Sequence, residues 1–203
     1  PLFGFALLAL GVVLVKAVQF ARIGVGHTAS VQKALALVRQ HAGPRAVEEL
    51  DKRREPIAKV AAAAIRGKLN PRMNDQLVRE EVTRVAQAQL DGLERGLAFL
   101  ALVAMIEPLL GLLGTVFGLI EAFQQIQTAG SRVEPATLAG GIWQALITTA
   151  VGLSAAIPVA IAHTWLQRVV DVEAHRMEDA ATQVFTSDLF DAIEEVAETR
   201  EAA

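Results

Sequence analysis

The sequence contains no cysteine and no tyrosine, and its acidic and basic residues nearly balance, with a net charge of −3. Without cysteine the chain can form neither a disulfide framework nor a zinc–thiolate site, and it has no thiol nucleophile. The slightly negative charge argues against a nucleic-acid-binding protein, which would present a basic surface. The four histidines show no metal-ligand spacing, and no phosphate loop or nucleophile–base motif is present. We therefore expect no cofactor and no enzyme activity.

Charged residues are also distributed unevenly along the chain. Hydrophobic residues make up 53% of the 203 residues, and the 20% that are charged are almost absent from three long windows. A soluble domain needs charge over its whole surface, whereas a helix that crosses a bilayer needs about 20 consecutive apolar residues. The pattern therefore predicts an all-α membrane protein with three transmembrane helices and long cytoplasmic helical extensions.

The three apolar windows divide the chain. Because Pro1 already lies in an apolar run, we expect the natural N-terminus to lie further upstream. Trp143 and Trp165 are 22 residues apart, about 33 Å along a helix, which suits the two aromatic belts of a bilayer. The predicted segments are a first transmembrane helix (1–21), a cytoplasmic helical region (22–96), a second transmembrane helix (97–123), a periplasmic loop (124–138), a third transmembrane helix (139–167) and a cytoplasmic C-terminal helix (168–203).

Local signals predict where helices begin. Apolar residues recur at helical spacing through the polar region, which indicates a bundle of amphipathic helices. Asn70 and Pro71 resemble a cap followed by proline at the first helical position, and no strong breaker follows before the second span. We therefore expect one long helix from Arg72 to Phe123. In the loop, Ser131 and Glu134 have capping-box spacing ahead of Pro135.

The distribution of lysine and arginine predicts the orientation. Fourteen of the nineteen lie between the first two spans, from Arg22 to Arg95, and the loop after the second span contains only Arg132. By the positive-inside rule, the large region and the C-terminal tail are cytoplasmic and the short loop faces outward.

The second span contains a carboxylate, Glu107, which costs at least about 2.5 kcal/mol in a bilayer and usually has a function. On a helical wheel Glu107 shares one face with Gly111, Gly114 and Gly118, and Thr115 flanks it. Small residues at this spacing let another helix approach closely. The second span is therefore predicted to pack against other helices around something polar.

The third span has a similar small-residue face, formed by Gly141, Ala145, Thr148 and Gly152, with Thr149 beside it. Threonines in a helix commonly bond back to their own carbonyls and only help packing. Here, however, threonines sit in small-residue surroundings on two helices joined by a short loop, which favours a pore or an ion path.

At these residues a family resemblance appears. The segments EPLLGLLGTVFGLIEAF (residues 107–123) and GGIWQALITTAVGLSAAIPVAIA (residues 140–162) closely resemble the two signature spans of the ExbB/TolQ/MotA family of ion-conducting motor proteins. Three spans with a large cytoplasmic segment after the first match the ExbB/TolQ branch, most closely ExbB. The resemblance is specific over residues 97–167 and only architectural elsewhere.

The resemblance implies a homo-oligomer, typically a pentamer, in the bacterial inner membrane. It would surround the single spans of an ExbD- or TolR-like partner, whose aspartate binds the proton. Ion flow would drive motion that passes to a TonB- or TolA-like protein. The pore-lining threonines of the family match Thr115 and Thr149, with Thr148 beside them. The partners would thus be proteins and the lipid bilayer, without nucleic acid.

Two positions depart from the family pattern. Gln144 stands where relatives commonly have a glutamate (GIAEAL or GISEAL), and glutamine cannot bind and release a proton. Glu107 stands where relatives more often have a small residue before the proline. We predict that Glu107 is a proton relay on the cytoplasmic side of the threonines and does not replace the glutamate missing at Gln144. The alternative is that Glu107 pairs with an arginine or a backbone group and only fixes packing.

Three alternatives compete with an ExbB-like motor subunit. One is a TolQ-like subunit for envelope constriction. Another is a membrane scaffold that conducts no ions, in which the glycine faces only assemble helices. The third is an intramembrane hydrolase using Glu107, which is disfavoured because a single carboxylate without a partner acid, metal or nucleophile makes no reaction.

Overall fold

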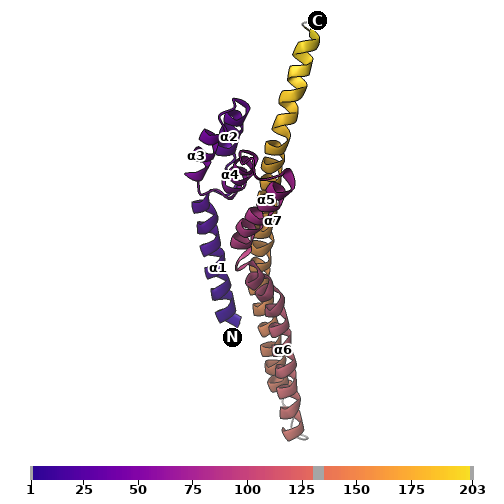
Figure 1. Ribbon diagram of the computed structural model, residues 1–203. Coiled ribbons are helices and arrows are strands. Elements are labelled where there is room, and N and C mark those ends of the chain that lie inside the picture. Colours follow the sequence, from indigo (N-terminus) through magenta and orange to yellow (C-terminus); the bar gives the residue numbers. More distant parts are fainter. Residues whose placement is uncertain (1, 130–134, 202–203) are drawn as a thin grey trace. The chain divides into compact units, whose positions relative to one another are not determined.

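A computed structural model describes residues 2–129 and 135–201, and within these residues the chain forms seven α-helices and no strand (Figure 1). The chain divides into two compact units. We call Pro1–Ala17 with Gly96–Gln167 the span unit, and Val18–Arg95 with Arg168–Ala203 the bundle unit. Each is described by itself.

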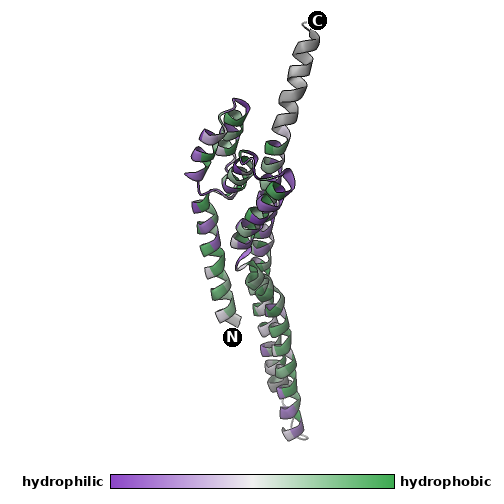
Figure 2. Ribbon diagram, viewed as in Figure 1, coloured by the Kyte–Doolittle hydropathy of each residue, from purple (hydrophilic) through white to green (hydrophobic). Residues whose placement is uncertain are grey.

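The span unit contains apolar helices. The first is most of α1 (Leu2–Ile23), the second is α6 (Leu97–Ala129), and the third is the first half of α7 (Pro135–Glu201). All three helices are long and apolar enough to cross a membrane, and α7 extends well beyond the length that a bilayer requires. Their apolar composition is visible in Figure 2. The predicted all-α fold with three candidate membrane spans is confirmed.

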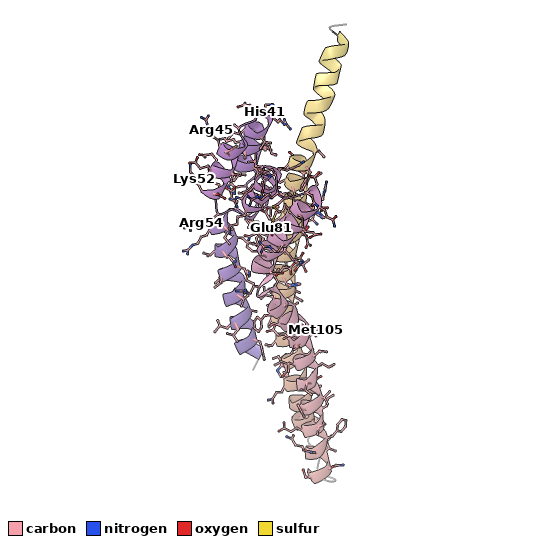
Figure 3. All side chains as sticks on the ribbon, in the orientation of Figure 1. His41, Arg45, Lys52, Arg54, Glu81 and Met105 are labelled. Atoms are coloured by element: carbon pink, nitrogen blue, oxygen red, sulfur yellow. The ribbon has the colours of Figure 1, made fainter. Side chains whose placement is uncertain are left out.

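Large apolar side chains on these helices point outward. Leu7 is 71% exposed, Phe117 is 62% exposed and Ile161 is 65% exposed, and Met105 projects from α6 in the same way (Figure 3). In water so much exposed apolar surface would cause aggregation, whereas in a bilayer it contacts lipid. The surface of the span unit is therefore suited to a membrane.

Helix α6 continues past the predicted end of the second span at Phe123 and reaches Ala129. The predicted capping box of Ser131 and Glu134 lies outside the described residues. Helix α7 begins at Pro135 and continues without interruption to Glu201, so the third span and the C-terminal segment form one helix.

The predicted single helix from Arg72 to Phe123 is wrong. The structure has two helices there, because α5 (Asp75–Glu94) ends before α6 begins at Leu97. Gly96 has a φ of +91°, a left-handed conformation that glycine adopts without steric cost. Arg95 just before it has an extended ψ of 120°. One glycine therefore separates α5 from α6.

The start of α5 also differs from the prediction at Asn70. Asn74 is the N-cap, and its side-chain oxygen accepts a hydrogen bond of 2.8 Å from the backbone N–H of Leu77. Asn70 instead forms a turn, in which its side chain accepts from the N–H of Arg72. Both asparagines bond to the backbone, but only the second one opens a helix.

The bundle unit packs four short helices against the later part of α7. These are α2 (Ala29–Arg39), α3 (Gly43–Asp51), α4 (Pro56–Lys68) and α5. Prolines in the first turns of α3 and α4 fit there because those turns have free N–H groups anyway. The bundle core consists of apolar side chains, including Leu50, Ile57, Val60, Ile65, Val78, Met177 and Val184.

Charged side chains cover the outside of the bundle unit, as the labels at Arg45, Lys52 and Glu81 show in Figure 3. Arg84 lies 2.6 Å from Glu81, and this hydrogen-bonded pair holds the pKa of the Glu81 carboxyl below its ordinary value. Such exposed pairs contribute little to stability. The bundle unit thus has the build of a water-exposed domain.

One buried carboxylate links two parts of the bundle unit. Glu173 of α7 is fully buried, and its Oε2 accepts a hydrogen bond of 3.0 Å from the backbone N–H of Gly26. Arg176 lies 3.6 Å from the same oxygen. Gly24 and Gly26 both have positive φ, so the turn after α1 presents its N–H group to α7. Glu173 therefore fixes this turn against the later part of α7.

Candidate functional site

Helix α6 and the first part of α7 run side by side (Figure 1), and glycines let their backbones approach closely. A Cβ added at Gly111 would lie 3.2 Å from the Cα of Thr149, and one at Gly152 would lie 3.1 Å from the Cα of Gly111. A Cβ at Gly118 would lie 2.7 Å from that of Ala145. Glycine at these positions permits the backbone contact.

The contacts also define how the two helices are aligned. Gly114 meets Thr148, Gly118 meets Ala145, and Gly141 meets Ala122. Each step of four residues along α6 is thus matched by a step of three or four residues back along α7. This antiparallel alignment sets the depth of every polar group on the two helices at about 1.5 Å per residue.

Thr115 and Thr149 lie within about 3 Å of each other in depth, because Gly114, next to Thr115, meets Thr148, next to Thr149. Their hydroxyls act differently. The Thr149 hydroxyl donates a hydrogen bond of 2.8 Å to the carbonyl of Gly111 on the other helix. The hydroxyl of Thr115 donates to its own helix at Leu112, and that of Thr148 does so at Gln144. Only Thr149 links the two helices by a hydroxyl.

Glu107 lies on α6 eight residues before Thr115, about 12 Å away along the helix. Its side chain is fully buried, and among the described residues neither carboxylate oxygen has a hydrogen-bond partner. Its backbone carbonyl lies 3.0 Å from the Cβ position of Gly152. Pro108 follows it within the helix. The alternative that an arginine or a backbone group pairs with this carboxylate finds no partner within the described residues.

Along the helix axes, Gln144 and Glu107 lie on opposite sides of Thr115 and Thr149. Its exposed side chain lines a groove of about 390 Å³ between the two helices. We call this the polar groove and define it by Gly114, Gly118, Glu121 and Gln125 of α6 with Gln144 and Thr148 of α7. The alignment separates Glu107 and Gln144 by about 12 residues, or about 18 Å.

Glu121 was missed in the sequence reasoning. It is a second carboxylate of the apolar helix α6, on the same side of the threonines as Gln144, and it lines the polar groove. The sequence did indicate this residue, because a carboxylate within the apolar segment GLIEAF is unusual. What the sequence did not show was the alignment that brings Glu121 beside Gln144.

No group of three or more histidine or acidic side chains that could hold a metal ion occurs in the part of the chain that the structure describes. The chemistry available here is that of carboxylates, amides and hydroxyls, which can bind water and transfer protons along hydrogen bonds.

Known proteins are similar to this chain in sequence. The profile of the MotA/TolQ/ExbB proton channel family matches residues 52–179, which include α6 and the first part of α7. A protein described as an ExbB homolog of Methanothermobacter thermautotrophicus is 32% identical over 133 residues, which cover 66% of this chain and 46% of the relative.

Two bacterial relatives match a shorter region. The biopolymer transport protein exbB1 of Vibrio cholerae is 42% identical over 85 residues, covering 41% of this chain and 37% of the relative. The Tol-Pal system protein TolQ of Pseudomonas aeruginosa is 40% identical over 97 residues, covering 46% of this chain and 42% of the relative. The chain thus spans less than half the length of these three relatives. From the extent of the family match, the chain belongs to the MotA/TolQ/ExbB proton channel family.

Proposed function

We propose that this chain is the inner-membrane subunit of a motor complex driven by the proton motive force. It forms a homo-oligomer, in our proposal a pentamer, around the single spans of an ExbD-like partner, and it energises TonB-dependent outer-membrane transport. A TolQ-like role in envelope constriction is the second candidate, because a TolQ protein is 40% identical over 97 residues.

The observation that supports ion transport best is the burial of Glu107 without a partner among the described residues. A buried charge without a partner is costly, so the group is expected to be neutral or to meet water or a partner in the assembled complex. A non-conducting scaffold has no use for such a carboxylate. A proton relay does, because it must alternate between the protonated and the ionised state.

In the proposed topology, the bundle unit and the C-terminal part of α7 are cytoplasmic and the α6–α7 connection faces outward. Glu107 then lies on the cytoplasmic side of Thr115 and Thr149, which line a common lumen. The aspartate of the partner span moves past the threonines and exchanges its proton with groups on either side.

Flux measurements in liposomes test the motor role. The full chain is reconstituted alone and together with its single-span partner, and proton uptake is followed after a pH gradient is imposed. We expect flux only with the partner, because this chain offers no continuous row of titratable groups. Flux at the same rate from this chain alone would contradict the proposal, and so would no flux from either sample.

The variant Glu107→Gln tests the relay. Glutamine keeps the shape and the hydrogen bonding but cannot titrate, so partner-dependent flux should fall at least about tenfold while assembly is retained. Glu94→Gln, at an exposed carboxylate of α5, is the matched control and should conduct like the wild type. If Glu107→Gln assembles and conducts at the wild-type rate, Glu107 has only a packing role.

Cell assays separate the two candidate roles. Deletion of the gene should abolish TonB-dependent uptake if the chain is ExbB-like. If uptake persists and envelope constriction fails, the TolQ-like role replaces it.

A further inference from the structure

The polar groove offers hydrogen-bonding groups at successive depths along the two helices. By the alignment of Gly118 with Ala145, Gln144 lies about 6 Å from Thr148 along the helix axes, Glu121 about 3 Å further and Gln125 about 6 Å beyond that. Four polar side chains thus follow one another over about 15 Å, from the threonine depth toward the C-terminal end of α6. Water between groups at such spacing can bridge them by hydrogen bonds.

The groove and most of the apolar surface of this part of α6 lie on different faces. Phe117 is the exposed large apolar residue that lines the groove, whereas Leu119, Ile120 and Phe123, which are also exposed, do not line it. Lipid is the suitable solvent for those side chains and a poor one for Glu121. The face with the groove therefore belongs against water or other polar groups, and the face with Phe123 against lipid.

Of the described residues that line the groove, only Glu121 can bind and release a proton, because the others carry amides, a hydroxyl or apolar atoms. Its side chain is exposed, and it forms no ion pair or hydrogen bond with any other described residue. We propose that Glu121 is the outward-side proton-exchange group of the ion path, at the mouth of the polar groove. This inference rests on the proposed function and adds a residue to it.

The step is a proton exchange. The Glu121 carboxylate takes a proton from water at the outer end of the groove and releases it to groove water beside Gln144 and Thr148, which restores the carboxylate. Glu121 lies six residues beyond Thr115, about 9 Å outward, while Glu107 lies about 12 Å inward. One carboxylate therefore stands on each side of the threonines, and the outer one lies about 3 Å in depth from the amide of Gln144.

The test uses the full chain reconstituted with its single-span partner, with proton uptake followed by a pH-sensitive dye. Glu121→Gln should reduce flux at least about tenfold with the oligomer intact by size-exclusion chromatography. The double variant Glu121→Gln with Gln144→Glu should recover flux, because it moves the carboxylate only about 3 Å in depth within the same groove. A role in packing alone would not be rescued by this exchange.

Glu80→Gln, at an exposed carboxylate of α5, is the matched control and should leave flux unchanged. If Glu121→Gln fails to assemble, Glu121→Asp and Glu121→Asn are compared, since they have the same size and differ in charge. Flux from the Asp variant alone supports the inference. Equal flux from the two, or wild-type flux from Glu121→Gln, overturns it. Those results would leave the motor proposal intact, because that proposal fails only if the wild-type complex shows no partner-dependent flux.

Discussion

The helices within the span unit and the helices within the bundle unit associate in opposite ways. In the bundle unit, apolar side chains such as Leu50 and Ile65 fill the space between helices, and the charged residues lie outside. In the span unit, large apolar side chains lie outside, and glycine brings the backbones of α6 and α7 into contact. Burial of apolar side chains drives association in water. Lipid removes that force, so the helices rely on close packing and on hydrogen bonds between them.

The difference between the two units predicts the largest effect for a substitution at Gly152. All three atoms nearest to its Cβ position are backbone atoms of Glu107 and Gly111, at 3.0 to 3.4 Å, so no side chain can move aside. Gly152→Leu should force α6 and α7 apart at a cost above the range of ~1–3 kcal/mol that is typical of overpacking. We expect loss of the oligomer in size-exclusion chromatography.

Gly140→Leu is the control for this variant, since nothing lies within 4 Å of its Cβ position. It should behave like the wild type. An oligomer of normal stability from Gly152→Leu would show that close backbone packing does not hold the span unit.

The matching change in the bundle unit removes a side chain. Leu50 is 1% exposed, and Leu50→Ala should lower stability by about 3 kcal/mol because it leaves a cavity. Hydrogen exchange should quicken in α3 and α4. Leu77→Ala, at a residue that is 47% exposed, should have little effect. Similar exchange in both variants would contradict a bundle that depends on its apolar core.

The features that sequence patterns predicted are local ones. Apolar length identifies α1, α6 and the first part of α7, because a bilayer requires it of each helix separately. The break at Gly96 was missed, because one glycine is compatible with a continuous helix as well as with its end. Asn70 was predicted as the cap because Pro71 follows it, whereas Asn74 is the cap in the fold. Asparagine is a suitable cap at either position, and only the fold selects one.

The candidate site depends on what sequence patterns do not contain, namely the alignment of two helices. Residue types identified Glu107, Thr115 and Thr149 as polar groups in apolar helices. Thr149 bonds to the carbonyl of Gly111, and Glu121 lines one groove with Gln144, only because Gly118 meets Ala145. That alignment results from how small side chains fit along both helices together, which neither helix determines alone.

The smallest predicted effect concerns the two threonines and refines the account of the span unit. Valine has a similar volume to threonine but no hydroxyl. Thr149→Val removes the hydrogen bond to Gly111 on the other helix, so it should cost about 0.6 kcal/mol, the average for such bonds between membrane helices. Thr115→Val removes only a bond within α6 and should leave stability unchanged.

Thermal unfolding in detergent should thus give a lower midpoint for Thr149→Val alone. Both variants should assemble, and both should conduct less if the threonines line one lumen. Equal midpoints would mean that backbone packing holds α6 and α7 without help from this hydroxyl. Full activity in both variants would make the threonines packing residues.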